Sequence, residues 1–86
     1  MSVGGNDGLL EFASDGLEAV GVKSWLLKDD SRPTTLKQRF RSKGMTLLRV
    51  NHLRQGAVSA RLQTRLLECL EDAMEGVSLL VFSDFN

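Results

Sequence analysis

Alternating polar and apolar positions run through the middle of the chain, from residue 34 to residue 51. The first arm sets two series of side chains on opposite sides: Leu36, Gln38 and Phe40 against Lys37, Arg39 and Arg41. A period of two fits a half-buried strand and no helix. Residues 42–44 (SKG) suit a tight turn, and residues 45–51 follow as a second arm. The pattern therefore predicts a β-hairpin at residues 34–51.

Two pairing registers compete for this hairpin, because a slip of one residue exchanges its faces. A two-residue loop at 43–44 would set Arg39 opposite Leu48 and mix charge with apolar bulk on both faces. A three-residue loop at 42–44 would place Gly44 in the left-handed conformation that glycine favours. It would also sort the faces into Leu36, Phe40, Thr46, Leu48 and Val50 against Lys37, Arg39, Arg41, Arg49, Met45 and Leu47. We prefer the three-residue loop, because an apolar side can then pack while the basic side meets solvent or an anion.

Two segments with helical periodicity flank the hairpin. In residues 9–20 the apolar positions lie on one side, and Gly21 ends the pattern. Residues 60–75 follow Ser59, a natural cap, and carry an apolar stripe that ends before Gly76. The charges of this second helix oppose its dipole: Arg61 and Arg65 come early, whereas Glu68, Glu71, Asp72 and Glu75 come late.

Three apolar runs predict further strands. Residues 1–3 look like a strand end, residues 22–27 like a short strand, and residues 77–82 (VSLLVF) like a central parallel strand covered on both faces. This alternation predicts an α/β fold, with a mixed sheet that includes the hairpin and two helices. Open sheets of this class bind ligands at the carboxyl ends of their parallel strands, here residues 4–7 and 83–86.

Length and composition argue against several classes of protein, including nucleic-acid binders, disulfide-stabilised proteins and membrane proteins. The chain has 86 residues, enough for one domain, and its formal net charge is zero, which argues against a dedicated nucleic-acid binder. Its single cysteine, Cys69, excludes a disulfide framework within the chain and suggests a reducing, cytoplasmic setting. The apolar runs are too short for a membrane span, and the N-terminus does not read as a signal peptide.

Three segments resemble the ribokinase-like (PfkB-family) carbohydrate kinases, and most of all the heptose-phosphate kinase domain of ADP-heptose synthases. Residues 2–8 (SVGGNDG), followed by Gly-Val at 21–22, resemble the family's strand end before a helix. Residues 32–39 (RPTTLKQR) with 47–50 (LLRV) resemble its hairpin, and residues 79–85 (LLVFSDF) resemble an apolar strand that ends in Ser-Asp-aromatic. The resemblance implies a partial ribokinase-like layered fold and an internal fragment of such a kinase domain over residues 1–86.

The resemblance also implies a function. The family transfers a phosphoryl group from ATP, with Mg²⁺, to a sugar hydroxyl in the cytoplasm, and a phosphorylated sugar would be the substrate. The chain lacks the family's upstream glycine pair and its downstream Gly-Ala-Gly-Asp segment, which supplies the catalytic base and cradles phosphate. We therefore expect no catalysis, no cofactor and no catalytic residue from these 86 residues alone.

Four residues are candidates for substrate contacts in the complete enzyme: Lys37, Arg39, Asp84 and Asn86. Lys37 and Arg39 would meet the sugar phosphate, although a solvated sheet face explains them equally well. Asp84 and Asn86 lie where α/β sheets bind ligands, with turn formation as the competing interpretation. Asp7 and its neighbour Asn6 fit a helix cap better than a substrate contact. We expect no metal site, because His52 has no second ligand at a suitable spacing.

Two other kinds of function compete with the kinase interpretation. The basic face of the hairpin could bind nucleic acid or an acidic protein, although few aromatic residues are available for stacking. A fragment with exposed sheet edges could also associate with copies of itself. A salt-dependent nucleic-acid titration and sedimentation at several concentrations would separate these alternatives.

Overall fold

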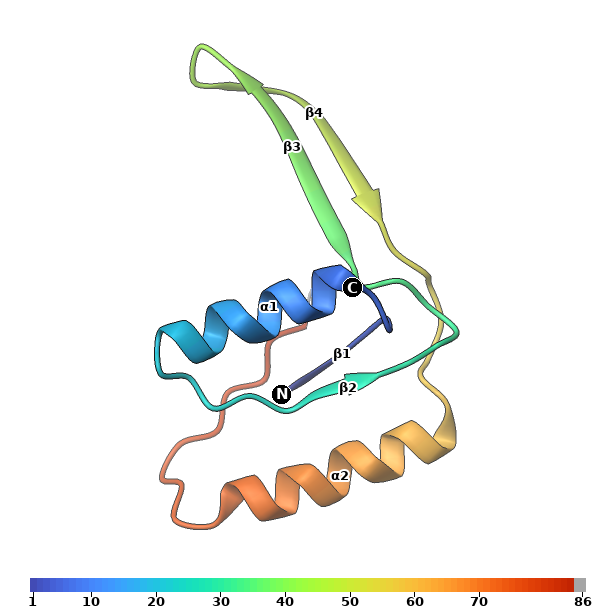
Figure 1. Ribbon diagram of the computed structural model, residues 1–86, viewed down its shortest axis with the longest axis vertical. Helices are drawn as coiled ribbons and strands as arrows, with labels where there is room; N and C mark the ends of the chain where they lie inside the picture. The colour runs from blue at the N-terminus through green and yellow to red at the C-terminus, as the bar shows by residue number, and fades with distance from the viewer. Residues whose placement is uncertain (85–86) are drawn as a thin grey trace.

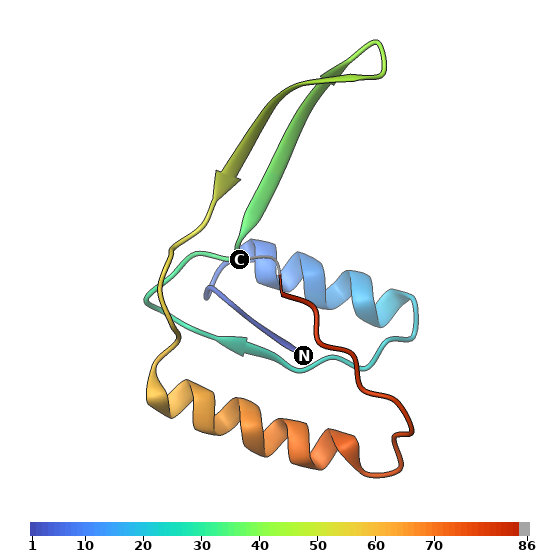
Figure 2. The ribbon, with the colours of Figure 1, turned by 180° about the vertical axis from the view of Figure 1, so that it is seen from behind.

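The parallel strand pair at the centre of the molecule is connected through the first helix. The computed structural model describes residues 1–84. Six elements follow in chain order: β1 (Ser2–Gly4), α1 (Gly8–Ala19), β2 (Leu26–Lys28), β3 (Leu36–Ser42), β4 (Met45–His52) and α2 (Ala60–Met74). Figures 1 and 2 show α1 and α2 on opposite sides of the β1–β2 pair, which gives three layers. The α/β class is thus confirmed, with both helices close to their predicted bounds.

Both helices begin and end where the sequence indicates. The Asp7 side chain accepts a hydrogen bond from the Leu10 backbone at the start of α1, and the Ser59 hydroxyl accepts one from the Leu62 backbone at the start of α2. The side chains of Ser, Thr, Asp and Asn satisfy N–H groups that have no partner within the helix. Gly21, with φ at +76°, follows the end of α1 as a left-handed stop.

The strands form two separate sheets, which corrects the expectation of one mixed sheet. Within residues 1–84, β1 pairs with β2 alone, in parallel, and β3 pairs with β4 alone, in the antiparallel hairpin. The chain turns after β2, and the hairpin then projects away from the layers along the long axis of the molecule (Figure 1). Its strand edges therefore do not reach the parallel pair.

The apolar run at residues 77–82 is not a strand, so this prediction is wrong. Within residues 77–84 the backbone joins neither sheet. A hollow of about 380 Å³ lies between this run, Met1 and the Leu67 side of α2. Neither face of the run is packed as a central strand requires, and Phe82 keeps 79% of its surface exposed.

The apolar core is small for a chain of this length. Leu10 of α1, Leu27 of β2 and Leu62 of α2 are its buried apolar side chains among the described residues. The accessible surface is 7295 Å², whereas a compact 9.5 kDa protein would expose about 5,000 Å². The radius of gyration is 15.2 Å against about 12 Å for a compact chain. The layers are therefore open, with much apolar surface uncovered.

No helix within residues 1–84 combines the length and the apolar character that crossing a membrane requires.

Candidate anion-binding site

The hairpin turn has two residues, not the three that we preferred from the sequence. Ser42 pairs with Met45, so Lys43 and Gly44 form the loop, with φ angles of +49° and +78°. Positive φ at both central positions is typical of the type I′ turn, which matches the twist of a hairpin. The predicted left-handed conformation of Gly44 is confirmed.

A β-bulge then corrects the register that this short loop would impose. The pairing shifts between Phe40 and Arg41, so that Phe40 faces Leu48 and Arg39 faces Arg49. Without the shift, Arg39 would face Leu48 and the charged and apolar side chains would mix. An extra residue in one strand changes the pairing beyond it, and this is how the bulge restores the sorted faces. The predicted face of Thr46 is wrong, because it pairs with Arg41 on the basic side of the bulge.

One face of the hairpin gathers positive charge around a shallow hollow. Its lining residues are polar or charged and come from both strands: Lys37, Gln38, Arg39, Arg49 and Asn51. The hollow measures about 190 Å³ and is open to solvent. Arg39 lies directly opposite Arg49, and Lys37 lies opposite Asn51. Like charges in direct opposition destabilise a strand pair, and an anion between them would relieve that repulsion.

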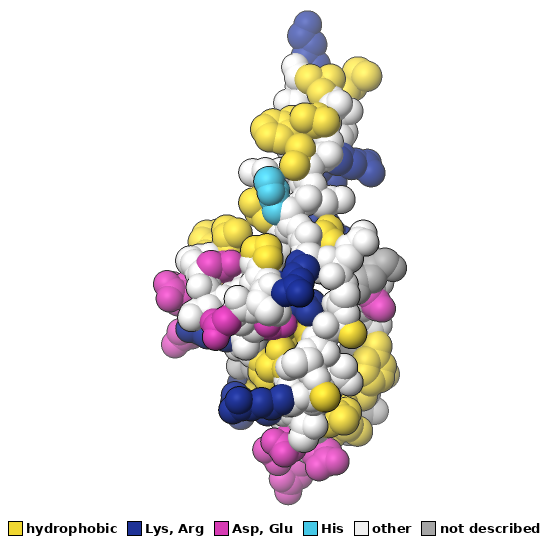
Figure 3. Space-filling model, turned by 90° about the vertical axis from the view of Figure 1, so that its right-hand side faces the viewer, with side chains coloured by type: hydrophobic (Ala, Val, Ile, Leu, Met, Phe, Trp, Pro, Cys, Tyr) yellow, Lys and Arg dark blue, Asp and Glu magenta, His cyan; other side chains and the backbone are white. Residues whose placement is uncertain are grey.

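The other face of the hairpin carries apolar side chains without a covering layer. Phe40 and its partner Leu48 are 51% and 54% exposed, and Val50 lies on the same side. Figure 3, which looks onto the right-hand side of Figure 1, shows hydrophobic and basic side chains separated along the projecting hairpin. The two faces of this element therefore offer different chemistry.

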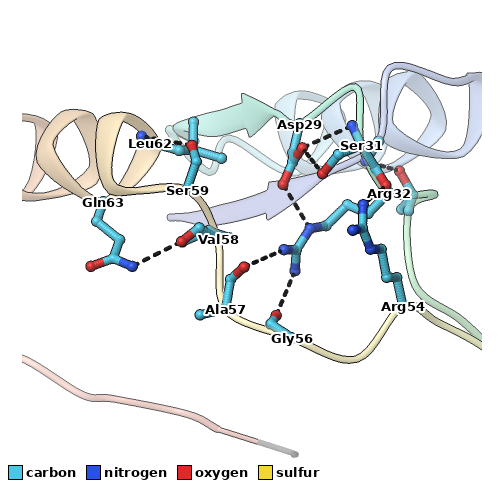
Figure 4. Close-up of polar contacts among 12 residues, drawn as sticks. Asp29, Ser31, Arg32, Arg54, Gly56, Ala57, Val58, Ser59, Leu62 and Gln63 are labelled. Atoms are coloured by element: carbon cyan, nitrogen blue, oxygen red, sulfur yellow. Dashed lines mark hydrogen bonds and ion pairs between the residues drawn. The ribbon is translucent and has the colours of Figure 1, made fainter.

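The base of the hairpin is fixed to the parallel pair through Arg32. Its Nε donates to Asp29 Oδ2 at 2.7 Å, and its two terminal nitrogens donate to the carbonyl oxygens of Gly56 and Ala57 at 3.4 and 3.1 Å (Figure 4). Arg54 donates to the Ser31 carbonyl in the same region. These bonds join the turn after β2 to the connection between β4 and α2. The chain therefore enters and leaves the hairpin at a cross-linked point.

Asp7, at the carboxyl end of β1, holds the first residues of the hairpin segment. Its Oδ1 accepts from the Thr34 hydroxyl at 2.6 Å, and its Oδ2 accepts from the Thr34 backbone N–H at 2.9 Å. The hydrogen bonds from Thr34 lower the pKa of Asp7. β3 begins at Leu36, two residues after the predicted start of the hairpin at residue 34. The predicted capping role of Asp7 is confirmed by its bond to Leu10.

The structure brings together only part of the predicted site. Lys37 and Arg39 line the same hollow, as the predicted basic face requires. Asp84 lies in the exposed segment after α2 and does not line this hollow, and Asn86 falls outside the described residues. The sequence-based choice omitted Arg49 and Asn51. The predicted basic face already contained Arg49, but its pairing with Arg39, and that of Asn51 with Lys37, depend on the observed register.

The described residues do not fit a Mg²⁺ site or a phosphate loop. Within residues 1–84, no three His, Cys, Asp or Glu side chains lie close enough together to hold a metal ion. The glycine-rich start of α1 is capped by the Asp7 carboxylate, which would repel phosphate. A Cβ on Gly5 would also lie 2.6 Å from the Arg32 carbonyl oxygen, so Gly5 serves close packing. We therefore assign no metal-dependent or nucleotide-dependent step to these residues.

Comparison with known proteins finds two curated relatives with the same name. The bifunctional protein HldE of Acidiphilium cryptum is 34% identical over 90 aligned residues, which cover 100% of this chain and 18% of that protein. The bifunctional protein HldE of Helicobacter hepaticus is 30% identical over 83 residues, which cover 95% of this chain and 17% of that protein. The chain thus spans less than a fifth of the length of these relatives. No family model and no solved structure matches it.

Proposed function

We propose that this chain forms part of a larger carbohydrate kinase of the ribokinase-like family, and that its hairpin binds the phosphate group of a phosphorylated sugar. Two HldE proteins align with all or nearly all of the chain, which supports a relationship to them. The hairpin emerges after β2, on the side of the parallel pair where α/β proteins bind ligands. The activity belongs to the larger protein, in which ATP is the phosphoryl donor, Mg²⁺ is the metal and the cytoplasm is the location.

The opposition of Arg39 and Arg49 is the observation that carries this proposal. Arginine presents a planar group of N–H donors that binds phosphate oxygens in pairs. Two such groups on neighbouring strands, with Lys37 beside them, surround a hollow of about 190 Å³. A phosphate dianion bound between Arg39 and Arg49 would attract both guanidinium groups and offset their mutual repulsion. The Asn51 amide supplies neutral donors and an acceptor for an adjacent sugar hydroxyl.

The role of these residues is to position the substrate. Phosphoryl transfer depends mainly on alignment and charge neutralisation, so a fixed anchor for the remote phosphate orients the accepting hydroxyl. The hairpin suits this role because Arg32 and Asp7 fix its base. The reacting hydroxyl, the base that deprotonates it and the nucleotide would all be held by other parts of the enzyme.

A binding titration with matched variants tests the proposal. The 86-residue chain is titrated with a seven-carbon sugar 7-phosphate, while amide NMR shifts are followed along the hairpin. We expect Arg39→Gln and Arg49→Gln each to weaken binding about tenfold, because each removes a charge-assisted pair of hydrogen bonds. Arg41→Gln is the matched control, since Arg41 donates to the Gly44 carbonyl and does not line the hollow.

The controls also separate competing functions. The unphosphorylated sugar should cause no hairpin shifts, and equal effects of Arg39→Gln and Arg41→Gln would refute the phosphate site. Nucleic-acid binding would appear as a steep, salt-dependent affinity for an oligonucleotide. We favour the sugar phosphate, because within residues 1–84 no aromatic side chain lines the hollow and Phe40 lies on the opposite face. Sedimentation at several concentrations tests the alternative that the chain associates with copies of itself.

A further inference from the structure

A second hollow, away from the hairpin, lies between the carboxyl end of β2 and the first turns of α2. It measures about 270 Å³, and its lining is mostly polar. Three cationic side chains contribute to it: Lys28 at the end of β2, and Arg61 and Arg65 on α2. Arg61 and Arg65 lie one helical turn apart, so they project from the same side of α2. No ion pair with these three side chains is formed within residues 1–84.

The two carboxylates near this hollow do not neutralise it. Asp29 already accepts from the Ser31 hydroxyl at 2.6 Å and from Arg32 Nε at 2.7 Å. Its charge is therefore matched by Arg32, and its pKa is lowered, chiefly by the hydrogen bonds from Ser31. Asp30 is exposed and shares the lining with three cationic side chains. The hollow keeps an excess of positive charge.

Arg61 is placed unfavourably with respect to the dipole of α2. The first turn of α2 contains no acidic residue and carries Arg61, although the N-terminal end of a helix dipole is itself positive. A negative group in the hollow would interact favourably with the dipole and with all three side chains. Figure 3 looks onto this end of the molecule and shows basic side chains close to the acidic ones at its lower edge.

We propose that this hollow is an anion site that takes a phosphate or phosphate-monoester group, held by Lys28, Arg61 and Arg65. The site uses no residue of the hairpin, so it goes beyond the proposed function and does not rest on it. Its volume admits a phosphate group with a small organic substituent. Charge-assisted hydrogen bonds from two arginines and one lysine supply the recognition.

Titration of the 86-residue chain with inorganic phosphate, at constant ionic strength set by chloride, tests this site. We expect saturable amide shifts in residues 28–30 and 59–65. Arg61→Gln or Arg65→Gln should weaken them about tenfold, and Arg65→Lys should weaken them less. The double variant Arg39→Gln and Arg49→Gln should leave them intact, which separates this site from the hairpin. Repetition with a sugar phosphate shows whether the ester or the free ion binds more tightly.

Three results would overturn the site. Shifts that chloride reproduces would show general screening, and shifts confined to the hairpin would place the phosphate there. Shifts at α2 that survive both Arg61→Gln and Arg65→Gln would show that these side chains are not ligands. Circular dichroism of each variant confirms that α2 is retained, because glutamine has a helix propensity close to that of arginine.

Discussion

Thr34 binds Asp7 through two of its own groups, a hydroxyl 2.6 Å from Oδ1 and a backbone N–H 2.9 Å from Oδ2. The same hydroxyl accepts a hydrogen bond from the Gly5 backbone at 2.9 Å. The end of β1, the start of α1 and the entry to the hairpin therefore meet at one threonine. The orientation of the basic face depends on this point, although neither residue lines the hollow.

Removal of the Thr34 hydroxyl should loosen this junction. Thr34→Val keeps the shape of the side chain but loses two hydrogen bonds, so we expect lower thermal stability and a higher pKa for Asp7. Thr34→Ser keeps the hydroxyl and should stay close to the original protein. Thermal denaturation and an NMR titration of Asp7 measure the two effects, with Thr35→Val as a neighbouring exposed control. An unchanged Asp7 pKa in Thr34→Val would contradict the role of the hydroxyl.

Stability should fall in acid because of two carboxylates. The pKa values of Asp7 and Asp29 are lowered in the folded chain, mainly by hydrogen bonds from Thr34 and Ser31 respectively. Their contribution is complete above the unfolded pKa of about 4 and is lost as the pH falls through the lower folded values. Urea unfolding at several values between about pH 2 and pH 6 should show this loss. The stability of Thr34→Val should depend less steeply on pH, because only Asp29 then keeps its fully lowered pKa.

Two glycines should respond in opposite ways to the same substitution. A Cβ at Gly5 would lie 2.6 Å from the Arg32 carbonyl oxygen and 2.7 Å from the Thr34 nitrogen, both backbone atoms. Gly5→Ala should therefore destabilise the chain by about 1–3 kcal/mol. Gly16 lies in the interior of α1 with open space around it, so Gly16→Ala should stabilise by about 0.5–1 kcal/mol. Urea midpoints compare the two, and equal effects would contradict the close packing at Gly5.

The two-residue turn makes a prediction for the tip of the hairpin. Gly44→Ala should cost about 1–2 kcal/mol, because its φ of +78° is strained for an L side chain. Lys43→Asn should instead stabilise the folded chain by about 0.5 kcal/mol, since asparagine adopts the left-handed region more readily than lysine. Hydrogen exchange of the β3 and β4 amides measures the effect of both substitutions on the stability of the hairpin. A gain in protection from Gly44→Ala would contradict the positive φ at residue 44.

Local features of the site were readable from the sequence, whereas its assembly was not. The alternation around Lys37 and Arg39 predicted a basic strand face, and the structure places both beside one hollow. The bulge after Phe40 could not be anticipated, because either loop length satisfied the local pattern. Arg49 was on the predicted basic face, but the observed register alone placed it opposite Arg39 and placed Asn51 opposite Lys37. The hollow at Arg61 and Arg65 could not be predicted either, although the sequence did show that the charges of this helix oppose its dipole.

The sequence by itself determined the two helices, their caps and the existence of the hairpin, because periodicity and capping act over a few residues. The tertiary structure decided which strands pair, and it left residues 77–84 outside both sheets. It also joined Thr34 to Asp7 across 27 positions of sequence. Strand pairing and such junctions depend on which backbone groups come within hydrogen-bonding distance in space, and no local pattern records that distance.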